Sequence, residues 1–403
     1  MDPALGAYLL DWLHLVVRWV HIAAAIAWVG ASFYFIALDH SLRAPLDEAD
    51  ERRGIGGEAW EIHGGGFYRI EKFRLAPARL PASLRWFKWE AYLTWLSGFG
   101  LLVLLYYLDP FTFLIDPRVA DLEPWQAVAA SVAMLGVGWL VYDRLSRSLE
   151  ERPVLLAVAI AALVVAAVWI SSLLFGPRAA YIQAGATLGT WMAANVFLVV
   201  IPGQRELVAA KEGGREPEAR FGARGKQRSV HNNYLTLPVL FAMIGQHFPF
   251  TYGHAYAPLV LLALMAAGAL AQHGLDLRHQ RRTGWGALAG AAAIAALVAA
   301  AIAPPLGSGA PTRPFTPEEA AAVQTVVSAR CVTCHSQRPT HPAFAAAPKG
   351  LALDTPRQVR ASAGRIYQQV VVTRLMPLGN VTSMTDEERD LLARWVRSGA
   401  PLP

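Results

Sequence analysis

The sequence has few cysteines and few charged residues, and each scarcity excludes a class of protein. Its 403 residues include only two cysteines, which excludes a disulfide-rich secreted scaffold. Charged residues make up 16% of the chain, well below the roughly 25% of ordinary soluble domains. The chain therefore cannot be one soluble globule, and its long apolar runs are expected to lie in lipid.

Several apolar stretches of about 20 residues are long enough to cross a hydrocarbon core as helices. They are, approximately, 12–38, 89–108, 124–145, 154–175, 178–203, 231–250, 254–277 and 284–304. The predicted fold class is therefore all-α, a polytopic membrane bundle of about eight transmembrane helices within residues 1–304. A large segment at 40–88 separates the first two helices. A Pro- and Gly-rich linker at 305–316 then leads to a small helical domain at 317–403.

The positions of Lys and Arg predict the orientation in the membrane. Among the connections between the predicted helices, those after the first, third, fifth and seventh stretches hold 22 Lys and Arg residues, whereas the alternate connections hold only Arg118 and Arg178. The positive-inside rule makes the basic connections cytoplasmic. Both termini and the C-terminal domain are then expected in the periplasm of a bacterial inner membrane.

The N-terminus and the net charge fit this topology. The first residues, MDPALGAYLLDWLH, lack the basic region of a cleaved signal peptide, so the first stretch is expected to remain as a membrane helix. The net charge of +6 is explained by the basic connections, so the lipid bilayer is an expected partner and nucleic acid is not.

Both cysteines belong to a single short motif. Cys331, Cys334 and His335 form CxxCH, the attachment pattern of haem c, in which the thiols bind the vinyl groups and the histidine binds iron. Met376, which precedes a proline, is the expected second axial ligand, and Met384 is the alternative. CxxCH, Met-Pro and a C-terminal amphipathic helix, in that order, resemble small class I cytochromes c. A zinc site would lack a second ligand pair nearby, and a disulfide would not require the histidine.

Histidines inside the predicted membrane helices are candidate haem b ligands. Ionisable groups in membrane spans are costly and usually face the bundle interior. His14 and His21 share one face of the first stretch, while His247 and His254 belong to the sixth and seventh. Transmembrane b-type cytochromes hold their haems through histidines at two depths in the membrane. The alternative for each is a hydrogen bond to a neighbouring helix. The polar residues 183–195 of the fifth stretch likewise line a cavity or bond between helices.

Residues 58–92 are unusual for a connection between membrane helices. Aromatic and charged side chains surround the triplet Gly64-Gly65-Gly66. The aromatic content argues against disorder, and the glycines allow a ligand to approach the backbone closely. The segment is therefore a candidate binding site. The alternative is an amphipathic stretch whose Trp and Lys side chains lie among lipid headgroups.

Long strings of this sequence resemble the PuuD-type integral-membrane urate oxidases. They are RWVHIAAAIAWVGASFYFIALD (18–39), GGEAWEIHGGGFYRIEKFRLAP (56–77), WFKWEAYLTWLSG (86–98), MAANVFLVVIPGQ (192–204) and HNNYLTLPVLFAMI (231–244). The resemblance covers nearly the whole chain and implies eight spans followed by a cytochrome c domain. His21 and Trp28 also resemble the H-x6-W pattern of HemJ-like membrane proteins, whose histidine is associated with haem b.

The resemblance implies oxidation of urate to 5-hydroxyisourate in purine degradation. Electrons would pass through haem to a downstream cytochrome c or terminal oxidase rather than to oxygen. Two other functions stay open: a non-catalytic cytochrome subunit fed by quinol or a partner dehydrogenase, and a transporter with a redox-sensing tail.

A site for urate, a planar anion, requires cations, stacking surfaces and a base, and segment 58–92 contains all three. The expected catalytic residues are His63, Glu61, Lys72 and Lys88. The expected substrate-binding residues are Trp60, Tyr68, Arg69 and Trp89. Histidine, with an ordinary pKa of about 6.5, suits proton removal near neutral pH.

Overall fold

A helix occupies each of the apolar stretches of the sequence. The computed structural model describes residues 3–303 and 315–402, so residues 305–314 of the predicted linker lie outside the described part. The helices are Pro3–Ser41 (α1), Trp89–Leu102 (α3), Pro124–Ser148 (α5), Pro153–Leu174 (α6), Pro177–Ala194 (α7), Ala219–Gly245 (α9), Ala257–His279 (α11) and Trp285–Ala301 (α12). Helices α5, α6 and α7 each begin with proline, whose fixed φ suits the first helical turn.

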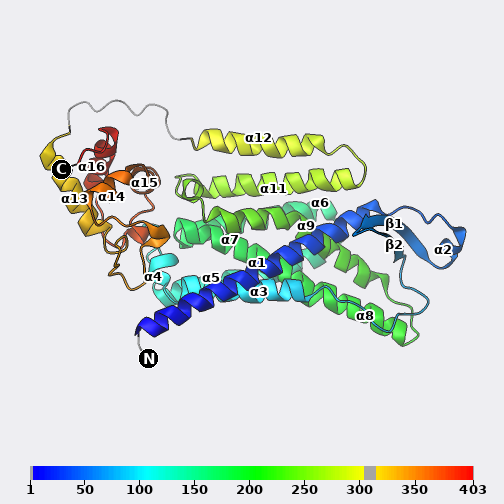
Figure 1. Ribbon diagram of the computed structural model, residues 1–403. Helices are drawn as coiled ribbons and strands as arrows, with labels where there is room; N and C mark the ends of the chain where they lie inside the picture. Colours follow the sequence, from blue (N-terminus) through cyan, green and yellow to red (C-terminus); the bar gives the residue numbers. More distant parts are fainter. Residues whose placement is uncertain (1–2, 304–314, 403) are drawn as a thin grey trace.

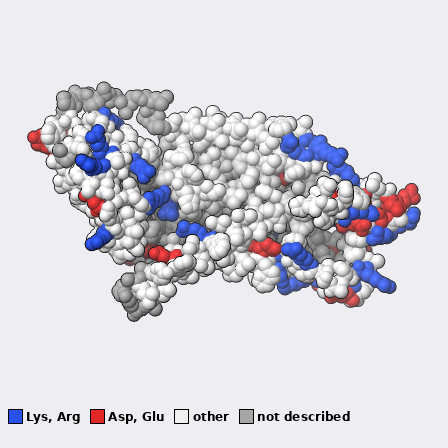
Figure 2. Space-filling model, viewed as in Figure 1, with Lys and Arg blue, Asp and Glu red and all other residues white. Residues whose placement is uncertain are grey.

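Several helices are suited to a lipid environment. In the part of the chain that the structure describes, five helical segments are long and apolar enough to cross a membrane, and α12 is a shorter apolar helix. The five are Tyr8–Ser41, Pro124–Ser148, Pro153–Leu174, Pro177–Glu212 and Ala257–His279. Figure 2 shows a broad uncharged surface over α11 and α12, with Lys and Arg toward both ends of the molecule. These features support a membrane protein, and the number of eight crossings stays a prediction.

The connection between α1 and α3 contains a β-hairpin. Strands Ile55–His63 (β1) and Gly66–Phe73 (β2) pair in antiparallel fashion and follow the short helix Glu48–Arg52 (α2). Gly64 and Gly65 form the turn with φ of 56° and 82°, as tight hairpin turns require. The structure is thus mostly helical, as predicted, but the all-α prediction is incomplete because it omits this sheet.

The hairpin and the C-terminal domain lie at opposite ends of the molecule. Figure 1 shows the start of α1 at the same end as the C-terminal domain, while β1, β2 and α2 project from the other. We call these the C-domain end and the hairpin end. Short helices Pro110–Phe113 (α4) and Pro249–Tyr252 (α10) lie in connections between the long helices. The buried core between the long helices includes Tyr142, Leu188 and Trp191.

Two of the long helices contain π-helical turns. Val103–Tyr107 (η1) extends α3, and Asn195–Val200 (η2) joins α7 to Ile201–Glu212 (α8). Such turns are rare and frequently occur at functional sites, because the wider turn moves a side chain out of the regular helical position. The second of them begins at Asn195, which is fully buried.

The C-terminal domain is a small helical unit with its own core. Its elements are Pro317–Arg330 (α13), Pro348–Gly350 (η3), Pro356–Ala361 (α14), Ala363–Ile366 (α15), Tyr367–Val372 (η4), Leu378–Asn380 (η5) and Asp386–Arg397 (α16). Thr316 and Thr385 cap α13 and α16 through capping boxes, which satisfy the free N–H groups of the first helical turn. Val327, Leu392 and Trp395 form the centre of the core.

Candidate functional sites

The hairpin divides the predicted site residues between its two faces. Because successive side chains of a strand alternate and Glu61 pairs with Tyr68, the side chains of Glu61, His63 and Tyr68 share one face. Trp60 pairs with Arg69 on the other face. His63 lies beside the glycine turn and is exposed. Glu61 accepts a hydrogen bond of 2.8 Å from Tyr34 of α1, so the first face is directed toward that helix.

The two predicted cations of the hairpin have carboxylate partners. Arg69 forms ion pairs with the buried carboxylates of Asp50 and Glu58. The hydrogen bond from Arg69 is the main cause that lowers the pKa of Asp50. Lys72 pairs with Asp39 of α1, which also binds Lys226 of α9 at 2.9 Å. These contacts tie the hairpin to α1, α2 and α9, and they occupy the groups that were expected to bind an anion.

Lys88 and Trp89 lie apart from the strands, at the start of α3. The Lys88 ammonium is 5.4 Å from the Trp89 ring centre, and Trp89 makes an edge contact with Tyr92. Phe87, next to this pair, packs on Phe35 of α1 at 4.8 Å. The C-terminal part of α1 therefore contacts both portions of segment 58–92, the hairpin through Tyr34 and the start of α3 through Phe35.

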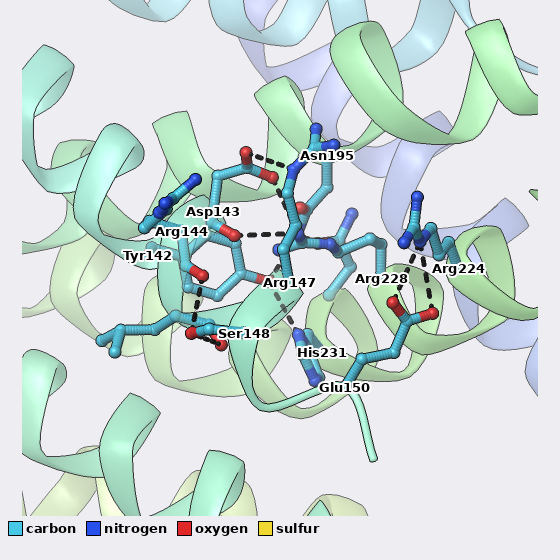
Figure 3. Close-up of polar contacts among 12 residues, drawn as sticks. Tyr142, Asp143, Arg144, Arg147, Ser148, Glu150, Asn195, Arg224, Arg228 and His231 are labelled. Carbon is cyan, nitrogen blue, oxygen red and sulfur yellow. Dashed lines mark hydrogen bonds and ion pairs between the residues drawn. The ribbon is translucent and has the colours of Figure 1, made fainter. Parts of the chain in front are cut away.

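A second group of polar side chains is buried where α5, η2 and α9 meet. The Tyr142 hydroxyl lies 2.8 Å from His231 Nδ1 and accepts a hydrogen bond of 2.9 Å from Asn195. Asn195 also donates to Asn232 at 2.8 Å. Figure 3 shows Tyr142, Asn195 and His231 directed toward one another. We call these residues, together with Arg228 and Asp143, the buried polar network.

Arg228 gives the buried polar network a positive charge. Its side chain is 2% exposed, and its Nη2 donates to Asp143 at 2.7 Å. The guanidinium also lies 5.1 Å from the ring centre of Tyr142, a favourable cation–π geometry. Tyr142 in turn stacks on Trp191 at 5.1 Å. Aromatic stacking and an ion pair therefore hold one cation inside the helix bundle.

Three polar atoms in this region have no hydrogen-bond partner among the described residues. They are Nη1 of Arg228, Oδ1 of Asn195 and Nε1 of Trp191. A buried polar atom without a partner costs about 1–3 kcal/mol, so such atoms need an explanation, with water or a ligand among the usual ones. The network and the adjacent Trp191 therefore offer two donors and one acceptor that are buried without a partner.

Next to this network, α9 and α11 share a set of amide and carboxylate bonds. Asn233 donates to Asp276 at 2.7 Å, and Gln272 donates to Asn233 and to Asp276 at 3.0 Å. All three side chains are buried.

The polar residues of the fifth stretch make hydrogen bonds to other helices. Gln183 accepts a hydrogen bond from Ser131 of α5, and Thr190 accepts one from Trp95 of α3. Interhelical bonding, one of the two interpretations of that polar stripe, is thus observed.

The predicted haem b histidines differ in their surroundings. His21 Nδ1 lies 3.0 Å from the Thr94 carbonyl oxygen of α3, so Nδ1 carries the proton and Nε2 is left as a ligand atom. His14 Nε2 is buried without a partner among the described residues. His247 and His254 lie between α9 and α11, outside both helices, and His254 Nδ1 accepts from the Tyr256 backbone.

The CxxCH motif directly follows α13. His335 Nδ1 lies 3.1 Å from the Leu351 carbonyl oxygen, which fixes the ring and leaves Nε2 available to bind iron. Burial raises the pKa of Cys331 to about 12 and also raises that of Cys334. Both cysteines therefore remain thiols at neutral pH. Within residues 3–303 and 315–402, no three His, Cys, Asp or Glu side chains gather as a metal site. The two free thiols and the oriented His335 ring are the donor set that a haem c would require.

The two candidate axial methionines occupy different positions in the C-terminal domain. Met384 is 4% exposed and belongs to the apolar core, whereas Met376 is only partly buried at its margin. Arg389, itself 5% exposed, donates to the Met376 carbonyl at 2.7 Å and to that of Val370 at 2.6 Å. The backbone of Met376 is thus fixed while its side chain stays close to the surface.

Sequence reasoning included Asn195 among the polar residues of the fifth stretch but did not assemble the buried polar network, although its other members also leave a signal. Arg228, Asn232 and Asn233 are polar residues at the start of an apolar run, and Tyr142 and Asn195 lie within two others. Intramembrane polar residues usually mark interhelical bonds or functional sites. Their partners belong to helices far apart in the sequence, so the network could not be assembled from the sequence.

The fold and the polar helix interior define a helical membrane protein with a small C-terminal helical domain. A sequence model of the family described as "Urate oxidase N-terminal" matches residues 7–303, and the chain belongs to this family. Family membership supports a urate-related oxidoreductase activity. Comparisons with curated proteins and with solved structures gave no match.

Proposed function

We propose that this protein oxidises urate to 5-hydroxyisourate and transfers the electrons through a C-terminal haem c to the respiratory chain. The match of residues 7–303 to the urate oxidase family carries the substrate assignment. The CxxCH motif, which follows the matched residues in the chain, supports transfer of the electrons to a haem rather than to oxygen. A downstream cytochrome c or terminal oxidase would be the acceptor.

In this proposal Cys331 and Cys334 hold haem c, and His335 and Met376 are its axial ligands. The Leu351 carbonyl orients His335, and the position of Met376 at the edge of the core favours it over Met384, which the core encloses. When bound, haem c accepts electrons one at a time and passes them on.

We also propose a haem b in the membrane domain, with His21 as its first ligand. The Thr94 carbonyl beside His21 Nδ1 is the outer-sphere contact that metal-bound histidines commonly have. His14 lies two helical turns away on the same face, and its buried Nε2 has no partner in the described chain. His247 and His254 are the remaining candidates for a second ligand.

For the substrate, the shared face of Glu61, His63 and Tyr68 is the proposed catalytic surface, with His63 as the base. The exposed ring of Trp60 and the Lys88–Trp89 pair remain candidates for binding the planar anion. Arg69 and Lys72 would contribute mainly by holding the hairpin in place, because carboxylates already occupy both.

The proposed location is a bacterial inner membrane, crossed eight times. The basic connections, which include the hairpin, would face the cytoplasm, where purine catabolites arise. The C-terminal domain would face the periplasm, where haem c is attached. The position of the start of α1 at the C-domain end (Figure 1) agrees with an even number of crossings.

The decisive experiment adds urate to the purified, oxidised single chain under anaerobic conditions without quinol. We expect the visible absorbance of haem c to change to that of the reduced form. Because urate takes up water and loses two electrons, one 5-hydroxyisourate should form for every two electrons that haem accepts. Reduction by quinol but not by urate would identify a non-catalytic electron-transfer subunit instead. Urate accumulation in vesicles without a spectral change would identify a transporter.

A further inference from the structure

The loop that carries Met376 is held between the two domains. Residues 373–379, here called the docking loop, run from the end of η4 into η5 of the C-terminal domain. On the domain's own side, the Met376 nitrogen donates to the Gln369 carbonyl at 3.0 Å, and Arg389 binds the Met376 carbonyl. The neighbours of Met376 on both sides contact the membrane domain instead.

Arg118 makes the polar contact to the docking loop. Its Nη1 donates to the Arg374 carbonyl at 3.1 Å. Asp116, which is 4% exposed, fixes the same guanidinium through two further bonds of 2.9 and 2.7 Å. A bidentate carboxylate restrains an arginine strongly in direction. The contact therefore comes from a preformed donor and not from a freely moving surface side chain.

Leu375 makes the apolar contact. It is 6% exposed and belongs to the same buried cluster as Tyr181 and Tyr252 of the membrane domain. Gly253, next to Tyr252, approaches the loop so closely that a β-carbon there would lie 2.4 Å from Thr373 Cβ and 2.8 Å from Leu375 Cδ1. The two surfaces fit together because position 253 has no side chain.

The far end of the loop and a neighbouring segment complete the interface. A β-carbon on Gly379 would lie 3.6 Å from the Ile115 carbonyl oxygen and 3.8 Å from that of Phe111. Phe113 of α4 makes an edge contact with Phe344 at 6.2 Å. Membrane-domain residues thus contact the loop before and after the methionine.

We propose that Arg118, Gly253 and their neighbours are positioning residues for the Met376–iron bond, so that docking of the two domains sets the reduction potential of haem c. This inference rests on the haem c and on the Met376 ligation of the proposed function. A haem with a methionine ligand has a higher reduction potential than the same haem after the methionine has left. A loop released from the membrane domain would let the methionine leave the iron and would lower the potential.

The test compares variants of the purified full-length chain in which only the membrane domain is changed. Arg118→Ala removes the donor, and Gly253→Ala inserts a methyl group against Thr373 and Leu375. The matched controls are Arg282→Ala, an exposed arginine in the α11–α12 connection, and Gly136→Ala, where a β-carbon has nothing within 4 Å. Arg118→Gln is a milder replacement should the alanine variant not accumulate.

Three quantities are measured for each protein: covalent haem by the pyridine haemochrome spectrum, the far-red charge-transfer band of methionine-ligated ferric haem, and the midpoint potential. We expect both docking variants to keep their haem, to lose most of the band and to have a lower potential, while the controls match the wild type. A normal band and potential in both docking variants would overturn the inference.

Failure of the underlying proposal would look different. A wild-type chain without covalent haem refutes the haem c of the proposed function. A wild type with covalent haem but without the methionine band refutes Met376 ligation, and the positioning role with it. If the wild type and both docking variants all have covalent haem and the methionine band, the proposed function stands and the positioning role is refuted.

Discussion

Arg228 is the residue whose loss we expect to be most costly to the fold. Its side chain is 2% exposed and pairs with Asp143, whose side chain is 18% exposed. Arg147 also pairs with Asp143, at 2.8 Å, so the carboxylate keeps one cation, but the variant loses a charged hydrogen bond that contributes about 1.5–3 kcal/mol. We therefore expect Arg228→Ala to lower the free energy of unfolding in detergent by about that amount.

A matched control lies on the same helix. Arg220 pairs with Glu218 at the surface, with both side chains more than half exposed, and such pairs contribute at most about 1 kcal/mol. Arg220→Ala should therefore unfold almost like the wild type. Equal losses in the two variants would contradict a special role of the buried position.

His63 provides the sharpest test of the catalytic assignment. It is an exposed residue beside the hairpin turn, so its removal disturbs no buried contact. We expect His63→Ala to lose urate oxidation while its haem c spectrum stays unchanged, since the base is absent but the electron outlet is intact. His279→Ala, an exposed histidine at the end of α11, is the control and should keep full activity. Normal urate turnover by His63→Ala would remove the assignment.

Local motifs could be predicted at the residue scale, and distributed ones could not. Cys331, Cys334 and His335 stand within five residues, so spacing alone identifies them. The partners of Tyr142 are His231 and Asn195, on other helices. No pattern in the sequence pairs residues across such separations, because helix packing brings them together.

The β-hairpin is the element that sequence reasoning missed. Its glycine turn is a usual hairpin signal, but its strands, IGGEAWEIH and GFYRIEKF, do not alternate strictly between polar and apolar residues. The segment was instead interpreted through its aromatic and charged content, as a binding or interfacial stretch. Long apolar helices are simpler to predict, since each needs only about 20 apolar residues in a row. The structure therefore contains helices where the sequence predicted them.

The hairpin should loosen at acid pH. The hydrogen bond from Arg69, with a smaller contribution from Arg53, lowers the pKa of Asp50 in the folded state. A carboxyl group with a depressed folded pKa stabilises the fold above its unfolded pKa, and this stabilisation is lost as pH falls through the folded value. Asp50 should therefore hold α2 to β2 at neutral pH and release it in acid.

Hydrogen exchange of the β1 and β2 amides measures this effect. We expect Asp50→Asn to exchange faster than the wild type near neutral pH, and the difference to shrink as the pH falls below the usual carboxyl range. Asp121→Asn, in the exposed connection before α5, should leave these amides unchanged at every pH. A difference that stays constant with pH would show that Asp50 acts through something other than its charge.

At the scale of the whole molecule, the contact between the domains lies beyond sequence reasoning. Arg118 and the Arg374 carbonyl are 256 residues apart, and neither residue belongs to a recognisable motif. The sequence predicted a haem domain and a membrane domain separately. Their joint surface depends on shape, such as the close approach at Gly253, which no composition or spacing encodes.

The arrangement of the whole chain predicts which parts face each side of the membrane. With eight crossings, the hairpin and the C-terminal domain face opposite sides, as their positions at opposite ends in Figure 1 suggest. Protease added to intact spheroplasts should therefore digest the C-terminal domain and spare a peptide tag in the Gly64–Gly65 turn. Inverted vesicles should give the reverse. If both sites are cleaved from the same side, the number of crossings is odd, and a haem c attached outside would be incompatible with a urate site that opens to the cytoplasm through the hairpin.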